Sequence, residues 1–179
     1  MKKSINISKK LKKEIARYAI SFFFAWLVSA LIGDFPFFRD IIKSFKLDTA
    51  LIKLMIVSTD SIFHILGFAT YSHGIYLSID GVHKVGLAYG CLGFRELSFF
   101  IVFVIFQFGK LRHKAWYIPL GVVLLIFLNI IRIVIIVWGQ YLNPNNFQVI
   151  HDIVSPLIMA PAILFLWLFW VIVYGKLEK

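Results

Sequence analysis

The sequence predicts an all-α integral membrane protein with about four transmembrane helices, an amphipathic helix on the outer face and a small β-hairpin before Cys91. Of its 179 residues, 60% are hydrophobic and 17% aromatic, and the mean hydropathy is +0.86. A soluble domain of this size has too little interior to bury that much hydrocarbon. The formal net charge of +10 gathers at the ends of apolar segments, where it sets topology rather than binding nucleic acid. We expect residues 1–179 to form a single membrane-embedded domain.

The N-terminal third begins with a basic segment, 1–17, rich in lysine. The positive-inside rule places this segment in the cytoplasm. The apolar run at 18–33 is long enough to cross a bilayer, which requires about 20 helical residues. Residues 33–48 mix charged and aromatic side chains around a proline, and we expect an interfacial loop or a short surface helix there.

The segment 49–70 also has the length of a span, but polar residues interrupt it. Lys53, Asp60 and His64 follow one another at intervals of seven and four residues, which places them near one helical face. This is an amphipathic pattern. We therefore expect 49–70 to lie on or partly in the outer leaflet.

A β-hairpin is expected between this segment and Cys91. Apolar and polar residues alternate in "IYLSI", and Asp80-Gly81 is a strong hairpin turn signal. The two-stranded hairpin should lead directly into Cys91.

The C-terminal half reads as three apolar spans. They cover 94–109, 115–140 and 153–175, separated by a dense basic loop at 110–114 and by a loop at 141–152 with an Asn-Pro turn. Aromatic residues at both ends of the middle span are typical of interfacial belts. The basic loop, and Lys176 and Lys179 at the end, indicate the cytoplasmic side.

These assignments constrain one another. If 110–114 is cytoplasmic, the span at 94–109 starts outside, and a cytoplasmic N-terminus then requires an odd number of spans before Cys91. The apolar run 18–33 supplies one, so 49–70 should not cross. The result is a four-span protein of the cytoplasmic (inner) membrane with both termini inside.

One charged residue lies inside an apolar run. Placing Arg132 near the middle of a spanning helix costs roughly 3 kcal/mol on insertion scales. Asn129 lies three residues earlier on the same face. Three interpretations stay open: Arg132 snorkels to the outer headgroups, pairs with a carboxylate such as Glu96, or belongs to a functional site.

The predicted positions of the single cysteine and of one histidine favour a functional role for both. Cys91 alone suits a buried apolar site, and His151 alone suits a solvated loop. In the topology above, however, Cys91, Arg132 and His151 all converge at the outer face. A thiolate nucleophile, a proton carrier and a cation for a developing oxyanion are the components of cysteine-based acyl transfer. The remaining histidines have no metal-ligand spacing and there is no second thiol, so no metal or cofactor is expected.

These motifs resemble the exosortase/archaeosortase family. "AYGCLGFRE", "NIIRI" at 129–133 and His151 before the last span match that family's Cys-Gly-Arg motif, Asn-x-x-Arg-Ile motif and downstream histidine. The resemblance covers roughly 70–175, the motif-bearing core, and the chain is most similar to the compact exosortases of Bacteroidetes-type bacteria. One difference is Leu92, where the family usually has serine or alanine.

The resemblance implies a function. It suggests a membrane cysteine transpeptidase or protease that cleaves the C-terminal sorting signal of exported proteins at the outer face and passes them to a surface polysaccharide or lipid. Cys91 would be the nucleophile, Arg132 the oxyanion or orienting cation and His151 the acid/base, and we assign Arg95 and Asn129 to substrate binding. The alternative is a non-enzymatic assembly partner or small carrier that uses Arg132 to bind an anionic group.

Overall fold

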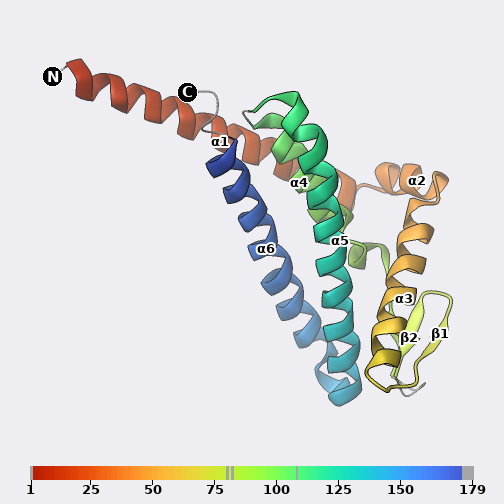
Figure 1. The fold of residues 1–179 in the computed structure, drawn as a ribbon. Coiled ribbons are helices and arrows are strands. Elements are labelled where there is room, and N and C mark those ends of the chain that lie inside the picture. The colour runs from red at the N-terminus through yellow and green to blue at the C-terminus, as the bar shows by residue number, and fades with distance from the viewer. Residues whose placement is uncertain (1, 80, 82, 108, 175–179) are drawn as a thin grey trace.

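The computed structural model describes residues 2–79, 81, 83–107 and 109–174. These residues form six α-helices and a small sheet, arranged as in Figure 1. In chain order the elements are α1 (Lys2–Asp34), α2 (Pro36–Ser44), α3 (Leu47–Ile65), β1 (Tyr71–His73), β2 (Tyr76–Ser78), β3 (Val85–Gly86), the 3₁₀ turn η1 (Tyr89–Cys91), α4 (Phe94–Phe106), α5 (Leu111–Leu142), the 3₁₀ turn η2 (Pro144–Asn146) and α6 (Phe147–Val173). The all-α membrane class predicted from the sequence is confirmed.

Two long helices, α5 and α6, form an antiparallel pair joined by η2, where the Asn-Pro turn was expected. In Figure 1 the start of α5, the end of α6 and the N-terminal end of α1 lie toward one end of the molecule. The sheet and η2 lie at the other end, and α3 packs beside α5 there.

Three helical stretches of the described residues are long and apolar enough to cross a membrane: Ile15–Asp34, Leu111–Leu142 and Phe147–Val173. The segment 94–109, expected as a further span, forms α4 and stays helical only to Phe106. Its 13 residues extend about 20 Å, short of the roughly 30 Å of hydrocarbon. The helix α4 alone therefore does not reach across.

Small residues bring α1 and α4 together. Ser21, Ala25, Ser29 and Gly33 repeat every four residues along α1, and the first three are at most 2% exposed. A Cβ on Gly33 would come within 3.4 Å of the Arg95 side chain. Such spacing lets membrane helices approach closely where no hydrophobic effect drives them together. It fixes the end of α1 beside the start of α4.

A glycine has the same effect between α4 and α5. A Cβ on Gly121 would lie 2.2 Å from Cζ of Phe100, which is buried. Tyr117, one turn earlier on α5, donates a 2.6 Å hydrogen bond to the Leu166 carbonyl and packs against Trp170 of α6. These contacts centre a core shared by α4, α5 and α6, whose buried members are Phe100, Val104, Tyr117, Leu125, Met159, Leu166 and Trp170.

The strands form one antiparallel sheet in the order β1-β2-β3. The tight turn joins His73 to Tyr76 through Gly74, whose φ is 62°, as at the first central position of a type II′ turn. The hairpin expected around Asp80-Gly81 is the antiparallel pair β2–β3, whose connection contains Gly81 with a φ of 75°. Asp80 lies outside the described residues. The structure differs in two respects: this connection is longer than two residues, and a third strand, β1, joins the sheet through the turn at Gly74.

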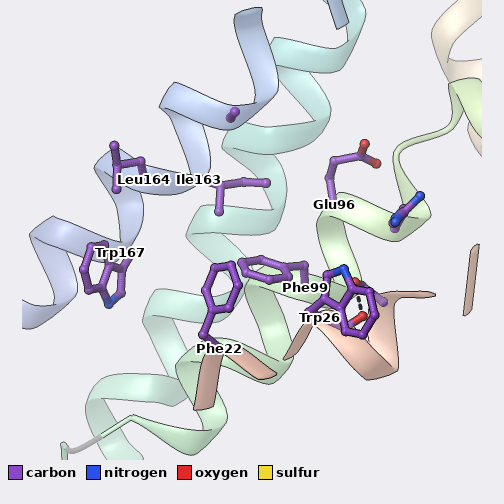
Figure 2. A pocket seen from close by; sticks show the side chains of 10 residues that line it. Phe22, Trp26, Glu96, Phe99, Ile163, Leu164 and Trp167 are labelled. Carbon is purple, nitrogen blue, oxygen red and sulfur yellow. Dashed lines mark hydrogen bonds between the residues drawn. The ribbon is translucent and has the colours of Figure 1, made fainter. Parts of the chain in front are cut away.

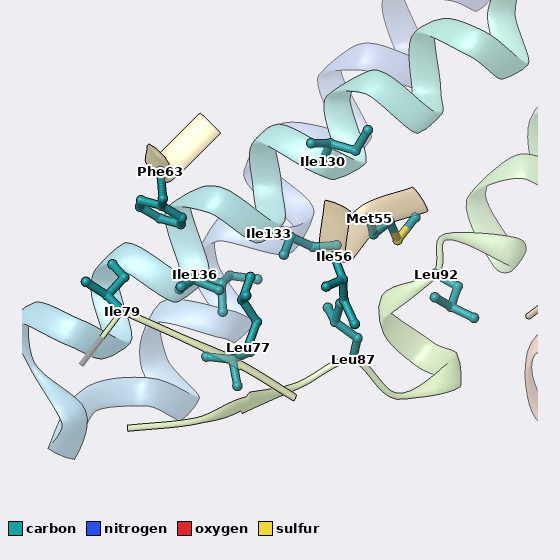
Figure 3. Close-up of a cluster of buried hydrophobic side chains, with 12 residues drawn as sticks. Met55, Ile56, Phe63, Leu77, Ile79, Leu87, Leu92, Ile130, Ile133 and Ile136 are labelled. Atoms are coloured by element: carbon teal, nitrogen blue, oxygen red, sulfur yellow. The ribbon is translucent and has the colours of Figure 1, made fainter. Parts of the chain in front are cut away.

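The second core lies between α3, the sheet and α5 (Figure 3). Its buried members are Met55, Ile56, Phe63, Leu77, Ile79, Val85, Leu87, Leu92, Ile130, Ile133, Ile136 and Val137. On the other side of α3, Lys53 and His64 are exposed and His64 Nε2 lies 3.7 Å from Asp60 Oδ2. The expected amphipathic pattern of this segment is therefore present, and α3 is not one of the three span-length apolar helices.

Candidate functional site

Cys91 ends η1, between the sheet and α4. Its N–H donates a 2.8 Å bond to the Ala88 carbonyl, and its side chain is half-buried. Two residues later Gly93 turns the chain into α4 with a φ of 75°, and a Cβ there would come within 3.3 Å of Asn129 Nδ2. Glycine suits this position because it adopts a positive φ without strain and because it has no Cβ to crowd Asn129. The result is that Cys91 sits directly against α5.

Asn129 links Cys91 to Arg132. Its amide nitrogen donates a 2.9 Å bond to the Cys91 carbonyl, and its carbonyl oxygen accepts a 2.9 Å bond from Nη1 of Arg132. The same amide nitrogen lies 3.6 Å from the sulfur of Met55 on α3. Because Asn129 is only 1% exposed, its side chain is oriented by the protein's own atoms, and it fixes Arg132 relative to the cysteine backbone.

Arg132 points inward and is 2% exposed. This placement disagrees with the snorkelling interpretation. No ion pair joins it to Glu96 among the described residues, and within the same part of the chain its Nε has no hydrogen-bond partner. At 1.5 Å per residue Arg132 lies about 32 Å along α5 from Leu111. That distance matches one hydrocarbon thickness, so a helix entering the bilayer at Leu111 would carry Arg132 to the far edge.

The guanidinium borders a cavity of about 260 Å³, here called the arginine cavity. Its walls come from the end of α1, η1, the start of α4, α5 and α6, and comprise Gly33, Asp34, Tyr89, Gly90, Phe94, Arg95, Glu96, Arg132, His151 and Ser155. Buried charge is costly unless it is paired, and here one Arg132 nitrogen is anchored while another has no protein partner. The cavity is therefore suited to a polar group that accepts a hydrogen bond.

His151 borders two cavities. It lines the arginine cavity and also a smaller one of about 160 Å³, here called the thiol cavity, together with Cys91, β3 and the first turns of α6. Its Nδ1 lies 3.1 Å from Oδ1 of the neighbouring Asp152. A carboxylate at one ring nitrogen orients an imidazole and leaves the other nitrogen available. The three residues expected to converge thus surround two adjoining cavities that share His151.

Arg95 and Glu96 occupy the first turn of α4, at the junction of the arginine cavity with a third cavity of about 510 Å³. This apolar cavity lies between α1, α4 and α6, and its other lining residues are Phe22, Trp26, Ser29, Phe99, Ala160, Ile163, Leu164 and Trp167 (Figure 2). Arg95 is exposed. It is therefore placed beside the arginine cavity rather than beside the thiol.

Two further polar residues at the arginine cavity were not singled out from the sequence. Ser155 lies one turn after His151, and its Oγ is buried without a hydrogen-bond partner among the described residues. The four-residue spacing, which puts both on one helical face, was the available signal. Tyr89 donates a 3.1 Å bond to the Ile32 carbonyl and carries Arg39 over its ring at 4.9 Å. Burial raises the pKa of Tyr89, with Arg39 acting in the opposite direction, so this hydroxyl remains a donor at neutral pH.

Comparisons with known proteins agree with the motifs. The family model described as transmembrane exosortase matches residues 13–168. The chain is also similar to a curated protein of Methanocaldococcus jannaschii named probable archaeosortase D, with 28% identity over 123 residues, 66% of this chain and 74% of that protein. No solved structure matches.

Proposed function

The chain belongs to the transmembrane exosortase family, and from this membership and the geometry above we propose that it is a cysteine transpeptidase that cleaves a C-terminal sorting signal of exported proteins. Family membership supports a membrane sorting role in general. The cysteine mechanism is our proposal. The observation that carries it is the link from the Cys91 backbone through Asn129 to Arg132, beside a histidine that borders both cavities.

The proposed reaction runs through a thioester. The Cys91 sulfur bonds to the carbonyl carbon of the scissile peptide while the thiol proton passes to His151. Nε–H of Arg132 donates to the developing oxyanion, which a preorganised donor in a dry site stabilises strongly. The C–N bond then breaks and the amine leaves with the proton from His151. A hydroxyl or amine of the acceptor attacks the thioester, His151 takes the nucleophile's proton, and the Cys91 thiol is restored.

Other residues serve positioning and substrate contact in this scheme. Asn129 positions Arg132 and the Cys91 backbone, because its amide nitrogen is hydrogen-bonded to the Cys91 carbonyl and its amide oxygen to Arg132. Arg95 contacts the substrate at the mouth shared by the arginine and apolar cavities. The hydroxyl of Ser155 offers a second hydrogen bond to a polar group beside Arg132.

We place the site at the outer face of the cytoplasmic membrane, with both termini in the cytoplasm. The basic ends of α1 and α5 support this side, because positive residues favour the cytoplasm. The partners of the protein would be exported proteins carrying a sorting signal, the lipid bilayer, and a surface polysaccharide or lipid as acceptor. No nucleic acid is involved in this proposal.

The test is to trap the acyl-enzyme. Membranes containing the wild-type chain are quenched in acid, and the peptide containing Cys91 is analysed by mass spectrometry. We expect the exported protein, cleaved of its sorting signal, joined to Cys91 through its new C-terminal carbonyl as a thioester, and absent from the matched Cys91→Ser chain. Cys91 is the only cysteine, so the adduct has one possible site on a thiol.

Retained processing by Cys91→Ala would contradict the transpeptidase proposal. It would favour the alternative of a non-enzymatic carrier or assembly partner. The specific observation in favour of that alternative is the buried Nε of Arg132 at the arginine cavity, which is suited to an anionic group.

A further inference from the structure

The sheet has a free edge at the candidate nucleophile. Among the described residues, β3 pairs with β2 only. The thiol cavity is lined by Val85, Gly86 and Leu87 together with Cys91 and His151. Ile133 and Ile136 of α5 line it too. Gly86 has no side chain and borders the cavity through its backbone, so the cavity lies where a fourth strand would pair if the N–H and C=O of Gly86 point away from β2.

Hydrogen-bond parity shows which backbone groups face that cavity. Leu87 N–H donates a 2.9 Å bond to the Ile75 carbonyl of the β2 side. In an antiparallel pair successive residues direct their N–H and C=O groups to opposite sides. Gly86 therefore directs its N–H and C=O away from β2. Its carbonyl accepts a 3.1 Å bond from Ala88, and no backbone partner of its N–H is found within the described residues.

The edge is held rigidly. Val85 and Leu87 are buried at 3% and 1% exposure in the core formed with α5 (Figure 3). Between them, Gly86 lies under Tyr76, whose ring a Cβ would approach to 3.0 Å. The strand is thus anchored by its side chains on the core side. A preformed edge of this kind binds an extended chain without having to reorganise.

The opposite wall of the thiol cavity is α6. Its first turns contribute Phe147, Gln148 and His151. The volume of about 160 Å³ corresponds to roughly five water molecules, which is enough for a peptide unit and a small side chain. A helix, about 10 Å across, does not fit. The geometry favours an extended backbone between β3 and α6.

We propose that the exported protein binds as an added β-strand on the free edge of β3, with one of its carbonyls accepting a hydrogen bond from Gly86 N–H. Gly86 precedes Cys91 by five residues, so a strand paired there continues past the thiol and His151. The inference rests on the proposed function and specifies the conformation and the backbone contacts of its substrate. Specificity then comes from side chains directed alternately toward α6 and toward solvent.

Disulfide tethering tests this without a known substrate. Short valine-rich peptides bearing a cysteamine disulfide are equilibrated with the full-length protein against mercaptoethanol, and attach only through Cys91, the single cysteine. The peptides differ by one N-methyl group each. In a strand the N–H and C=O of one residue point to the same side, so a methyl group on a nitrogen that faces β3 holds that residue's carbonyl away from Gly86 N–H. We expect such N-methylation to weaken tethering about fivefold, the worth of one hydrogen bond, and N-methylation at the intervening positions, which face away from β3, to leave it unchanged.

A second readout follows the acceptor amide itself. Tethering of the unmethylated peptide should slow hydrogen exchange at Gly86 N–H. The matched control is the chain Cys91→Ser/Ser155→Cys, whose thiol faces the arginine cavity; it should show neither the period of two nor the slowed exchange at Gly86.

The outcomes separate the two proposals. Tethering without a period of two, or with unchanged exchange at Gly86, overturns strand addition even if the acyl-enzyme on Cys91 is found. If tethering shows a period of two and slowed exchange at Gly86 but no acyl-enzyme forms in membranes, strand addition on β3 is supported. Only the transpeptidase proposal is then contradicted.

Discussion

At the scale of single residues, the site depends on a charge held in one orientation. Arg132 donates from Nη1 to Asn129, its Nε has no hydrogen-bond partner among the described residues, and the residue lines the arginine cavity. A guanidinium can do both at once because its donors form a fixed planar fork, whereas an ammonium is a single point of charge. The residue-scale predictions test whether this geometry, rather than charge alone, matters.

Arg132→Lys should insert normally and remain abundant, yet be nearly inactive. Losing one oxyanion donor typically costs about a hundredfold or more in rate. The measurement is processed product per unit of membrane-inserted protein. Wild-type activity in this variant would remove Arg132 from the site and leave Arg95 as the nearby cation to test.

Asn129→Ala should reduce processing by a similar factor, because Arg132 loses the acceptor that orients it. Residues that act as one unit are strongly non-additive. The double variant with Arg132→Lys should therefore be little worse than either single variant. Independent losses that multiply would show that Asn129 does not act through Arg132.

His151→Ala should lower the rate by roughly 10² to 10⁴, the usual contribution of general acid–base catalysis. Asp152→Asn keeps a polar group beside Nδ1 and should cost less, which makes it the matched control. A loss below tenfold for His151→Ala would indicate a solvated residue and direct attention to His73 or His83.

At the scale of elements, small residues set how closely the helices approach. Gly121 allows the Phe100 ring to lie against the α5 backbone, and the Ser21, Ala25, Ser29 and Gly33 row does the same for α1 on α4. Because α4 begins immediately after Cys91 and Gly93, its distance from α5 also sets the position of the thiol. Packing far from the cavities thus controls the site.

Gly121→Ala should destabilise the protein by about 1–3 kcal/mol, the usual cost of overpacking a core, since the new Cβ would lie 2.2 Å from Phe100. Thermal unfolding in detergent measures this. Val123→Ala, on the same helix but 65% exposed, is the control and should change the melting temperature little. Equal melting temperatures for both variants would show that α4 can move away at no cost.

At the scale of the whole molecule, the orientation of the helices in the membrane decides on which side the substrate binds. Arg112 lies in the first turn of α5, and Asn145 lies in η2 at the other end. On a Cys91→Ala background, Arg112→Cys should react with an impermeant thiol reagent only from the cytoplasmic side, and Asn145→Cys only from outside. Labelling of both from one side would contradict the proposed topology and the outer-face site.

The sequence by itself determined the properties that are local. The membrane class and three of the four expected spans follow from hydropathy along contiguous segments, whereas the fourth, at 94–109, forms a helix of only 13 residues. The joint role of Cys91, Arg132 and His151 stays a prediction: Cys91 lines the thiol cavity, Arg132 the arginine cavity and His151 both. Periodicity likewise predicted the amphipathic face of α3.

Only the tertiary structure decided the features that depend on pairs distant in sequence. The third strand, β1, which joins β2 through the turn at Gly74, was not expected from the sequence. The inward course of Arg132 depended on Asn129 meeting the Cys91 carbonyl 38 residues away. The position of β3 beside His151 required the first turns of α6 to come near the sheet. Hydropathy and spacing record which segments prefer lipid or water, but hydrogen bonds between distant segments form only once helices and strands are packed in three dimensions.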